Sequence, residues 1–247
     1  MKLQIFSDLH LEGYHSPSVV WKFVNPVAPI AVVAGDIHSR RFEESVEEIA
    51  TKFEHVVCVL GNHEFYHRDI SWRPKKILMP SNVHVLDRST VTIEDTLFVG
   101  CTLWSDFNNQ ETTLMHAAHD MINDFRLIGK SGTRFTPLNA HELHLKDYQY
   151  LKTIIEQNRG QKLVVVTHFM PSYDCVHEQW KTPQTELLNK YFSANCDELI
   201  RISEAKAWIF GHTHDYRDLE LYGVPLLCNP LGYYGERRDF KEMVVEL

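Results

Sequence analysis

The stretch VVCVLGNHE, residues 56–64, joins an apolar run to a cluster of glycine, asparagine, histidine and glutamate. The apolar part, Val56–Leu60, shows no alternation of apolar and polar residues. Such runs are typical of strands that are buried on both faces. The polar part begins where the run ends, so the stretch predicts a buried strand with metal-binding types of side chain at its carboxyl end.

Four other apolar runs of the chain end in the same way. In open α/β sheets, ligands bind beyond the carboxyl ends of the strands, so these polar clusters are expected to converge although they lie far apart in sequence. The five clusters are Asp8-Leu9-His10 after Leu3–Phe6, Gly35-Asp36 after Ile30–Ala34, Gly61-Asn62-His63-Glu64 after Val56–Leu60, Thr167-His168 after Leu163–Val166, and Gly211-His212-Thr213-His214 after Ala207–Phe210.

Segments with helical periodicity lie between these runs. Apolar residues recur at helical spacing over 42–53, 114–125 and 145–155, and Thr136-Pro137 before the last of them is a helix-start signal. Strands that alternate with helices favour a layered α/β architecture. The three short apolar segments near the end of the chain predict an antiparallel edge: 219–222, 226–228 and 243–245.

The composition is that of an ordinary globular protein. The chain has 247 residues, with 44% hydrophobic and 23% charged, and no linker or repeat divides it, so we expect a single domain over residues 1–247. Its formal net charge of -8 argues against extended nucleic acid as a partner. Five cysteines without a Cys-x-x-Cys pair, and the lack of a signal peptide or a membrane-length apolar run, predict a cytoplasmic protein that spans no membrane.

The side chains of the five clusters suit transition metals. Aspartate and asparagine offer oxygen and histidine offers nitrogen, a mixture that favours Mn, Fe, Zn or Co over the all-oxygen sites of Ca and Mg. The candidate ligands outnumber those of one tetrahedral site, but they fill two sites that share an aspartate. They are Asp8, His10, Asp36, Asn62, His168, His212 and His214.

The ordered set of clusters resembles the calcineurin-like metallophosphoesterases. That family has Asp-x-His, Gly-Asp, Gly-Asn-His-Asp/Glu, a lone His and Gly-His-x-His, and all five blocks occur here in this order over residues 8–214. The resemblance implies a four-layer α/β/β/α sandwich of two mixed sheets. It also implies two divalent metal ions per chain, of which Mn, Fe and Zn are the candidates.

The resemblance assigns a role to each position. Asp8, His10 and His214 are expected to hold one metal, and Asn62, His168 and His212 the other. Asp36 is expected to bridge the two metals. His63 matches the family's non-ligand histidine, which donates a proton to the leaving oxygen or stabilises charge on the phosphoryl group.

These roles predict a phosphoric ester hydrolase. A metal-bound hydroxide would attack a small phosphomonoester or phosphodiester, and the sequence does not separate phosphatase from phosphodiesterase. The protein phosphatases of the superfamily carry Asp-Arg-Gly after the Gly-Asp block, whereas Ile37-His38-Ser39-Arg40-Arg41 follows here. A metal-dependent nuclease is the alternative, and a scaffold without catalysis is a weaker one because no ligand has been lost.

Substrate contacts are harder to locate from the sequence. His38 lies close to a proposed ligand, and Arg126 ends a predicted helix where a guanidinium can grip phosphate. We name both as candidate substrate-binding residues, although a surface histidine and a helix-end interaction are the simpler interpretations. The loop 229–233 after a predicted strand is expected near the metals.

Overall fold

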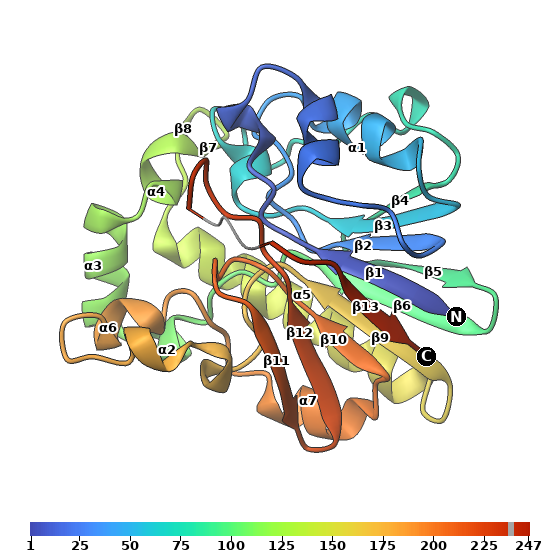
Figure 1. The fold of residues 1–247 in the computed structure, drawn as a ribbon. Coiled ribbons are helices and arrows are strands. Elements are labelled where there is room, and N and C mark those ends of the chain that lie inside the picture. Colours follow the sequence, from blue (N-terminus) through green and yellow to red (C-terminus); the bar gives the residue numbers. More distant parts are fainter. Residues whose placement is uncertain (237–239) are drawn as a thin grey trace.

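Two mixed β-sheets lie face to face in the computed structural model, which describes residues 1–236 and 240–247 (Figure 1). The strand order of the first sheet is β13 (Met243–Glu246), β1 (Lys2–Phe6), β2 (Ile30–Val33), β3 (His55–Val59) and β4 (Val83–Leu86). The order of the second is β11 (Arg217–Leu221), β12 (Val224–Cys228), β10 (Ala207–Ile209), β9 (Lys162–Thr167), β6 (Thr96–Cys101) and β5 (Ser89–Ile93).

The central strands of both sheets are parallel, and three of the four edge pairings are antiparallel, the exception being β4 with β3. In the first sheet β1 to β4 run parallel and β13 pairs antiparallel with β1; in the second, β12, β10, β9 and β6 run parallel, with β11 and β5 antiparallel at the edges. The expectation that the last three strands form one antiparallel edge is therefore wrong. β13 belongs to the other sheet, where Lys2 lies opposite Glu246 and Met243 joins the core between the sheets.

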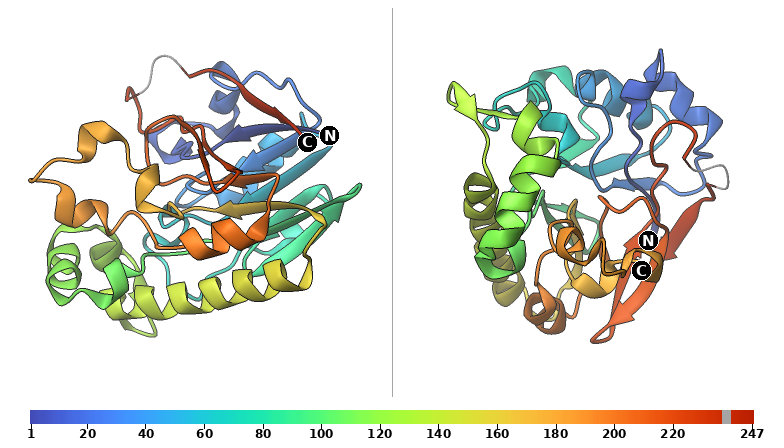
Figure 2. Two further views of the ribbon diagram at one scale, coloured as in Figure 1. Left: turned by 90° about the horizontal axis from the view of Figure 1, so that it is seen from below. Right: turned by 90° about the vertical axis from the view of Figure 1, so that its left-hand side faces the viewer.

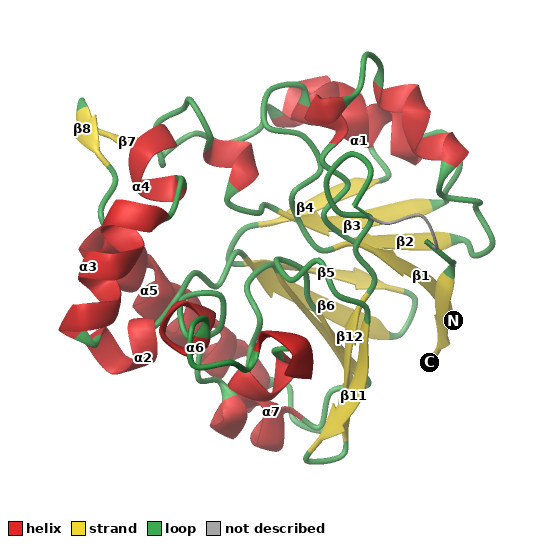
Figure 3. Cartoon of the chain, turned by 60° about the vertical axis from the view of Figure 1, so that its left-hand side comes forward, coloured by secondary structure: helices red, strands yellow, loops and turns green. Residues whose placement is uncertain are grey.

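Helices cover the outer face of each sheet, as Figures 2 and 3 show. α1 (Phe42–Ala50) contacts β3 and β4, whereas α5 (Pro137–Gln157) contacts β6 and the neighbouring α7 (Asp197–Ser203). The expected four-layer α/β/β/α arrangement is thereby confirmed. The α5 helix begins as the sequence predicts, because Thr136 and Asn139 form a capping box and Pro137 takes the first turn.

Shorter elements form the remaining connections between the strands and long helices. The predicted helix over 114–125 is broken, since α3 ends at Met121 and Ile122 is extended before α4 begins at Asp124. These elements are α2 (Phe107–Gln110), α3 (Thr112–Met121), α4 (Asp124–Leu127), α6 (Glu186–Asn189), the hairpin β7 (Gly129–Lys130) and β8 (Thr133–Arg134), and the 3₁₀ turns Leu11–Gly13, Pro17–Lys22, His63–Phe65, Lys76–Leu78, Tyr173–Cys175 and Glu178–Trp180. Among the described residues, no helix is long and apolar enough to cross a membrane.

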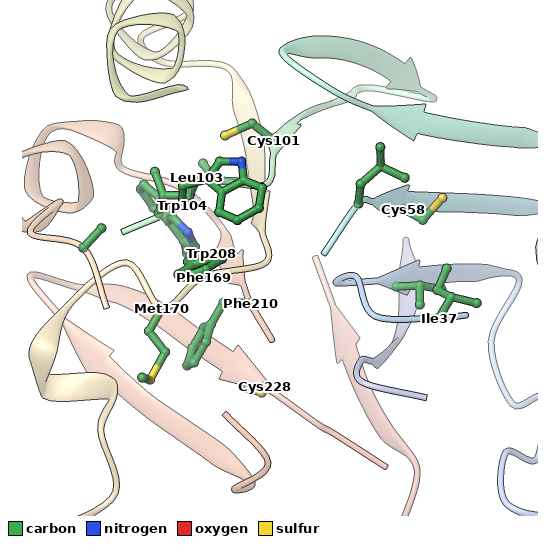
Figure 4. Packing of buried hydrophobic residues seen from close by; sticks show 14 of the residues in the cluster. Ile37, Cys58, Cys101, Leu103, Trp104, Phe169, Met170, Trp208, Phe210 and Cys228 are labelled. Carbon is green, nitrogen blue, oxygen red and sulfur yellow. The ribbon is translucent and has the colours of Figure 1, made fainter. Parts of the chain in front are cut away.

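The strands are apolar on both faces because each sheet lies between two layers. In β2, Ile30 and Val32 belong to the core between the sheets, while Ala31 and Val33 belong to the core under the helices. Figure 4 shows part of the latter core, where aromatic rings gather on the side of the second sheet. This double burial removes the apolar–polar alternation of a half-exposed strand.

The carboxyl ends of the strands meet at one edge of the sandwich. The N–H of Asp8, after β1, donates to the carbonyl of Gly35, after β2, at 3.0 Å. The N–H of Gly211, after β10, donates to the carbonyl of His168, after β9, also at 3.0 Å. Backbone hydrogen bonds therefore fix the loops that carry the polar clusters relative to one another.

Candidate metal centre

The seven candidate ligands lie in two adjoining groups. One ligand atom each of Asp8, His10 and His214 lies within 4.8 Å of the other two, and the same holds for Asp36, His168 and His212. In the second group, Asn62 Oδ1 lies 2.9 Å from His168 Nε2. The structure thus brings together all seven residues, although they are spread over more than 200 positions of sequence.

Asp36 belongs to the second group and also faces the first. Its Oδ2 is 3.4 Å from His168 Nε2 in one group and 3.8 Å from His10 Nε2 in the other. Its Oδ1 accepts a hydrogen bond from the N–H of His63 at 2.9 Å, which fixes the carboxylate plane. The Asp36 carboxylate therefore faces imidazole nitrogens of both groups.

The hydrogen bonds of the first group turn two imidazole lone pairs toward each other. His10 Nδ1 lies 3.1 Å from a carboxylate oxygen of Glu12, and His214 Nδ1 lies 2.6 Å from one of Glu236. A carboxylate fixes a donating N–H on the ring nitrogen that faces it. Both Nε2 atoms then present lone pairs, and they lie 3.1 Å apart.

The second group is arranged in the same way. His168 Nδ1 lies 2.8 Å from the carbonyl of Ala34, so its Nε2 faces the site. The side-chain N–H₂ of Asn62 donates to Asp124 at 2.8 Å, so Asn62 Oδ1 also faces the site. His212 Nδ1 is 3.1 Å from His168 Nε2. Burial, and next the neighbouring His168, lower the pKa of His212 well below its usual range, which keeps that ring neutral.

Two lone pairs that face each other at these distances repel, so a cation must lie between the two atoms. That cation is either a proton or a metal ion. Against the effect of burial, Asp36 raises the pKa of His168 to about 9, so positive charge is favoured at this position. Metal ions displace such protons when they bind. The nitrogen and oxygen donors fit Mn, Fe or Zn, and the carboxylates and carbonyl behind the histidines are the usual outer partners of metal-binding imidazoles.

The backbone turns sharply at the ligands. Asp8, His10, Asp36 and His212 have φ of 51°, 44°, 53° and 67°, in the left-handed region that aspartate and histidine enter more readily than most residues. Gly61 is needed for space, because a Cβ there would overlap Asp36 Oδ1. Such local strain is common at functional sites, where the surrounding structure holds it in place.

His63 lies beside the two groups without joining either. Its Nδ1 is 3.1 Å from Glu12 Oε1, and its Nε2 is 3.9 Å from Asp36 Oδ2. Burial opposes its charge, but Asp36 and Glu12 together raise the pKa of His63 to about 9. Cations bound at Asp36 would offset the effect of Asp36 on the pKa of His63, while the effect of Glu12 would remain. The ring is therefore placed to carry a proton at the mouth of the site.

The comparison with known proteins agrees with this geometry. The sequence model of the calcineurin-like phosphoesterases matches residues 1–216 of the chain. The chain belongs to this family. An uncharacterized protein, L509, of Acanthamoeba polyphaga mimivirus is 26% identical over 273 residues, which cover 96% of this chain and 93% of that protein.

Solved structures share the phosphoesterase fold. The phosphopantetheinyl hydrolase PptH of Mycobacterium tuberculosis superposes with a TM-score of 0.72 at 20% identity and covers 99% of this chain and 95% of its own. TT1561 of Thermus thermophilus gives a TM-score of 0.54 at 11% identity, covering 99% of this chain and 97% of its own. At these identities the likeness concerns the fold.

A buried carboxylate absent from the sequence prediction orients the side chain of Asn62, a candidate ligand of this phosphoesterase. Asp124 accepts hydrogen bonds from Asn62, from the Tyr66 hydroxyl at 2.9 Å and from the Tyr191 hydroxyl at 2.5 Å. Burial raises its pKa, and the three donors act in the opposite direction. The sequence points to Arg126 in this segment, because a guanidinium is the more obvious contact for phosphate, and gives no signal for the carboxylate two positions earlier.

The two predicted substrate contacts lie elsewhere. Arg126 is exposed, and its guanidinium donates to the carbonyl of Asp120 at the end of α3. His38 is buried, and its Nδ1 accepts from the N–H groups of Arg40 and Arg41 at 3.1 and 3.3 Å. The structure therefore gives both a role in the local backbone, and neither lines the cavity of ≈ 320 Å³ above the ligands.

Other members of the site were also absent from the sequence prediction. Glu12 links His10 to His63, and Glu236 orients His214. The signal for Glu12 was its place two residues after His10; nothing in the sequence marked Glu236. The loop 229–233 does reach the site, as expected, since the Tyr233 hydroxyl lies 3.2 Å from His63 Nε2.

We predict that Asp124→Ala lowers metal affinity and activity by about 10–100-fold, the usual loss for an outer partner of a metal ligand. Without this carboxylate the Asn62 amide is free to rotate its oxygen away. Metal titration with an activity readout measures the effect. Tyr191→Phe is the matched control, since it removes one hydrogen bond to Asp124 and none to Asn62. Equal losses in both variants would contradict the orienting role.

Proposed function

We propose that the chain hydrolyses a phosphate ester of a small molecule with two divalent metal ions, held by the seven ligands and bridged by Asp36. The observation that carries this proposal is the pair of converging acceptor groups with Asp36 Oδ2 between them. One group is Asp8, His10 and His214, and the other is Asn62, His168 and His212. Bound metals would supply Lewis-acid stabilisation of the phosphoryl oxygens and water activation near neutral pH.

The residues of the chain supply orientation and a proton. Glu12, Glu236 and the carbonyl of Ala34 hold the histidine rings with their site-facing nitrogens unprotonated once metal is bound. His63 gives a proton at Nε2 to the oxygen on which charge develops as the ester bond breaks. Its Nδ1 remains paired with Glu12, which keeps the ring in the productive orientation.

Chelation tests the proposal as a whole. We expect that removal of metal with a strong chelator abolishes hydrolysis of aryl phosphate esters, and that Mn, Fe or Zn restores it. Because the substrate class is open, the panel should include phosphomonoesters, cyclic nucleotides and linear diesters. The name of the mycobacterial structural neighbour adds phosphopantetheinyl esters to this panel. Full activity in metal-free protein would overturn the mechanism.

His63→Asn separates proton donation from metal binding. We predict that kcat for an alkyl ester falls by ~10²–10⁴-fold, the contribution of a general acid, while metal content is unchanged. Esters of p-nitrophenol are expected to suffer less, since their leaving group needs no proton. His67→Asn is the control: His67 lies in the same loop, is exposed and has φ of 62°, which asparagine tolerates. A uniform loss on both kinds of ester would argue for a merely structural role.

No specific feature of the described residues supports the two alternative functions, a nuclease and a scaffold without catalysis. A nuclease for extended strands needs cationic side chains beside the metals, and among the described residues that line the cavity above the ligands none is lysine or arginine. A scaffold without catalysis would have no need of the ordered ligand set. Cytoplasmic location and the absence of a nucleic-acid partner stay predictions of the sequence.

A further inference from the structure

A second and larger cavity adjoins the metal centre. Its volume is ≈ 840 Å³, and its walls come from the segment 170–192 and from residues after β10. Phe192, His212 and His214 line both this cavity and the one above the ligands, so the two are neighbours across a shared wall. The space far exceeds what a phosphate group needs, which points to an organic part of the substrate.

The walls of the larger cavity are mostly apolar and aromatic. Val176, Leu188, Phe192 and Trp180 line it, and Trp180 keeps 48% of its surface exposed. An exposed tryptophan beside a metal centre offers a flat face for stacking. The cavity therefore offers a stacking surface to a flat organic group.

Hydrogen bonds hold Trp180 in place. Its indole N–H donates to Asp215 Oδ2 at 2.6 Å, and the Gln179 amide donates to Asp215 Oδ1 at 2.6 Å. The side chain of Asn189 donates to the carbonyl of Trp180, also at 2.6 Å. The ring is thus fixed before a ligand arrives, which lowers the entropic cost of binding against it.

The described lining of the two cavities offers no cationic side chain to a second phosphate. Among the described residues lining the two cavities there is no lysine or arginine, whereas Asp215 and Glu236 line the larger one. Lys181, which follows Trp180 in the chain, is paired with Glu178 at 2.7 Å, and Lys190, which follows Asn189, lies 3.6 Å from Glu111. A phosphodiester monoanion fits this site better than a monoester dianion, because it carries one negative charge fewer that bound metals must compensate.

We infer that the larger cavity binds an uncharged, flat organic group that stays esterified to phosphorus, so that the substrate is a phosphodiester. The inference rests on the proposed function. His63 lines the cavity above the ligands and not the larger one, so the leaving oxygen departs on the side of His63. The water oxygen forms the new P–O bond and loses a proton to solvent, while the bond from phosphorus to the leaving oxygen breaks. The leaving oxygen takes the proton of His63, which is then restored from solvent. The products are an alcohol and a monoester of the retained group.

Two diesters with the same leaving group test the inference. In bis-(p-nitrophenyl) phosphate the retained group is aromatic, and in methyl p-nitrophenyl phosphate it is a methyl group. We expect Trp180→Ala to lower kcat/KM for the first by about tenfold, the scale of one lost stacking contact, and to leave the second unchanged. Trp180→Phe should keep most of the preference, and Leu145→Ala, which is exposed on α5, should behave as wild type.

The outcomes separate the two proposals. Equal losses on both diesters in Trp180→Ala, or a kcat/KM for p-nitrophenyl phosphate above that for the bis-ester in the wild type, would overturn the inference and leave the proposed function intact. If the wild type shows no metal-dependent hydrolysis of any of the three esters, the proposed function fails, and the inference fails with it.

Discussion

Asp36→Asn is expected to lower kcat/KM for phosphoester hydrolysis by at least about 10³-fold, because it removes the carboxylate whose Oδ2 faces imidazole nitrogens of both ligand groups. A metal pair supplies several kcal/mol of charge stabilisation in the transition state, and about 1.4 kcal/mol corresponds to a factor of ten in rate. Asparagine keeps the size of the side chain and can still accept the N–H of His63. It cannot offer a negative oxygen to both groups.

The measurement combines steady-state kinetics with metal analysis of the same sample. The variant should bind fewer metal ions than the wild type while it keeps its fold, as judged by circular dichroism. Asp120→Asn is the control, because Asp120 is exposed at the end of α3. Wild-type activity in Asp36→Asn would remove the bridging role from the mechanism.

Glu64→Gln is expected to destabilise the protein and to weaken metal binding together. The Glu64 carboxylate is fully buried and accepts four backbone N–H groups: those of Asp36 and Gly61 on one oxygen, and those of Ile37 and His38 on the other. Burial, and next the charge of Asp36, raise the pKa of Glu64 to about 7, although the four N–H donors act in the opposite direction. Cations bound at Asp36 would reverse the effect of the Asp36 charge. Glu64 is thus the clamp between the loops that carry Asp36 and Asn62.

Glutamine offers only one acceptor oxygen, so its amide N–H₂ would face two backbone donors. Each buried donor left without a partner costs about 1–3 kcal/mol, so the free energy of unfolding should fall by about 2–6 kcal/mol. This loss is a large part of the free energy of unfolding of a typical domain, which is about 5–15 kcal/mol. Urea unfolding measures the loss, with Glu156→Gln on the exposed face of α5 as control. Unchanged stability and metal affinity would show that the clamp is dispensable.

The parts of the fold that the sequence predicted are those with local signals. The strands β2, β3, β9 and β10 carry continuous apolar runs that end in glycine or polar residues, and the run of β1 is interrupted only by Gln4. Their parallel order places the clusters at one edge. By contrast, β4 and β5 are half-exposed and too polar to show such a run. The partner of β13 depends on register between the ends of the chain, which no local pattern encodes.

The residues of the site also divide into those with a local sequence signal and those without one. His168 comes directly after β9 and Asp36 three positions after the end of β2, so the pattern of apolar runs predicts their position. Glu12, Asp124 and Glu236 reach the ligands from loops or from a short helix, and only the folded backbone decides where those side chains point. Arg126 was chosen for its chemistry, but the turn before it sends the guanidinium to the end of α3 and brings Asp124 inward.

The central claim is that the two ligand groups form one dinuclear centre that cuts phosphate esters. The most direct test titrates metal into metal-free protein while bound metal and hydrolysis of bis-(p-nitrophenyl) phosphate are measured in the same samples. We predict saturation at two ions per chain, with activity that follows the doubly loaded species. Saturation at one ion with full activity, or two bound ions without hydrolysis of any phosphate ester, would contradict the account.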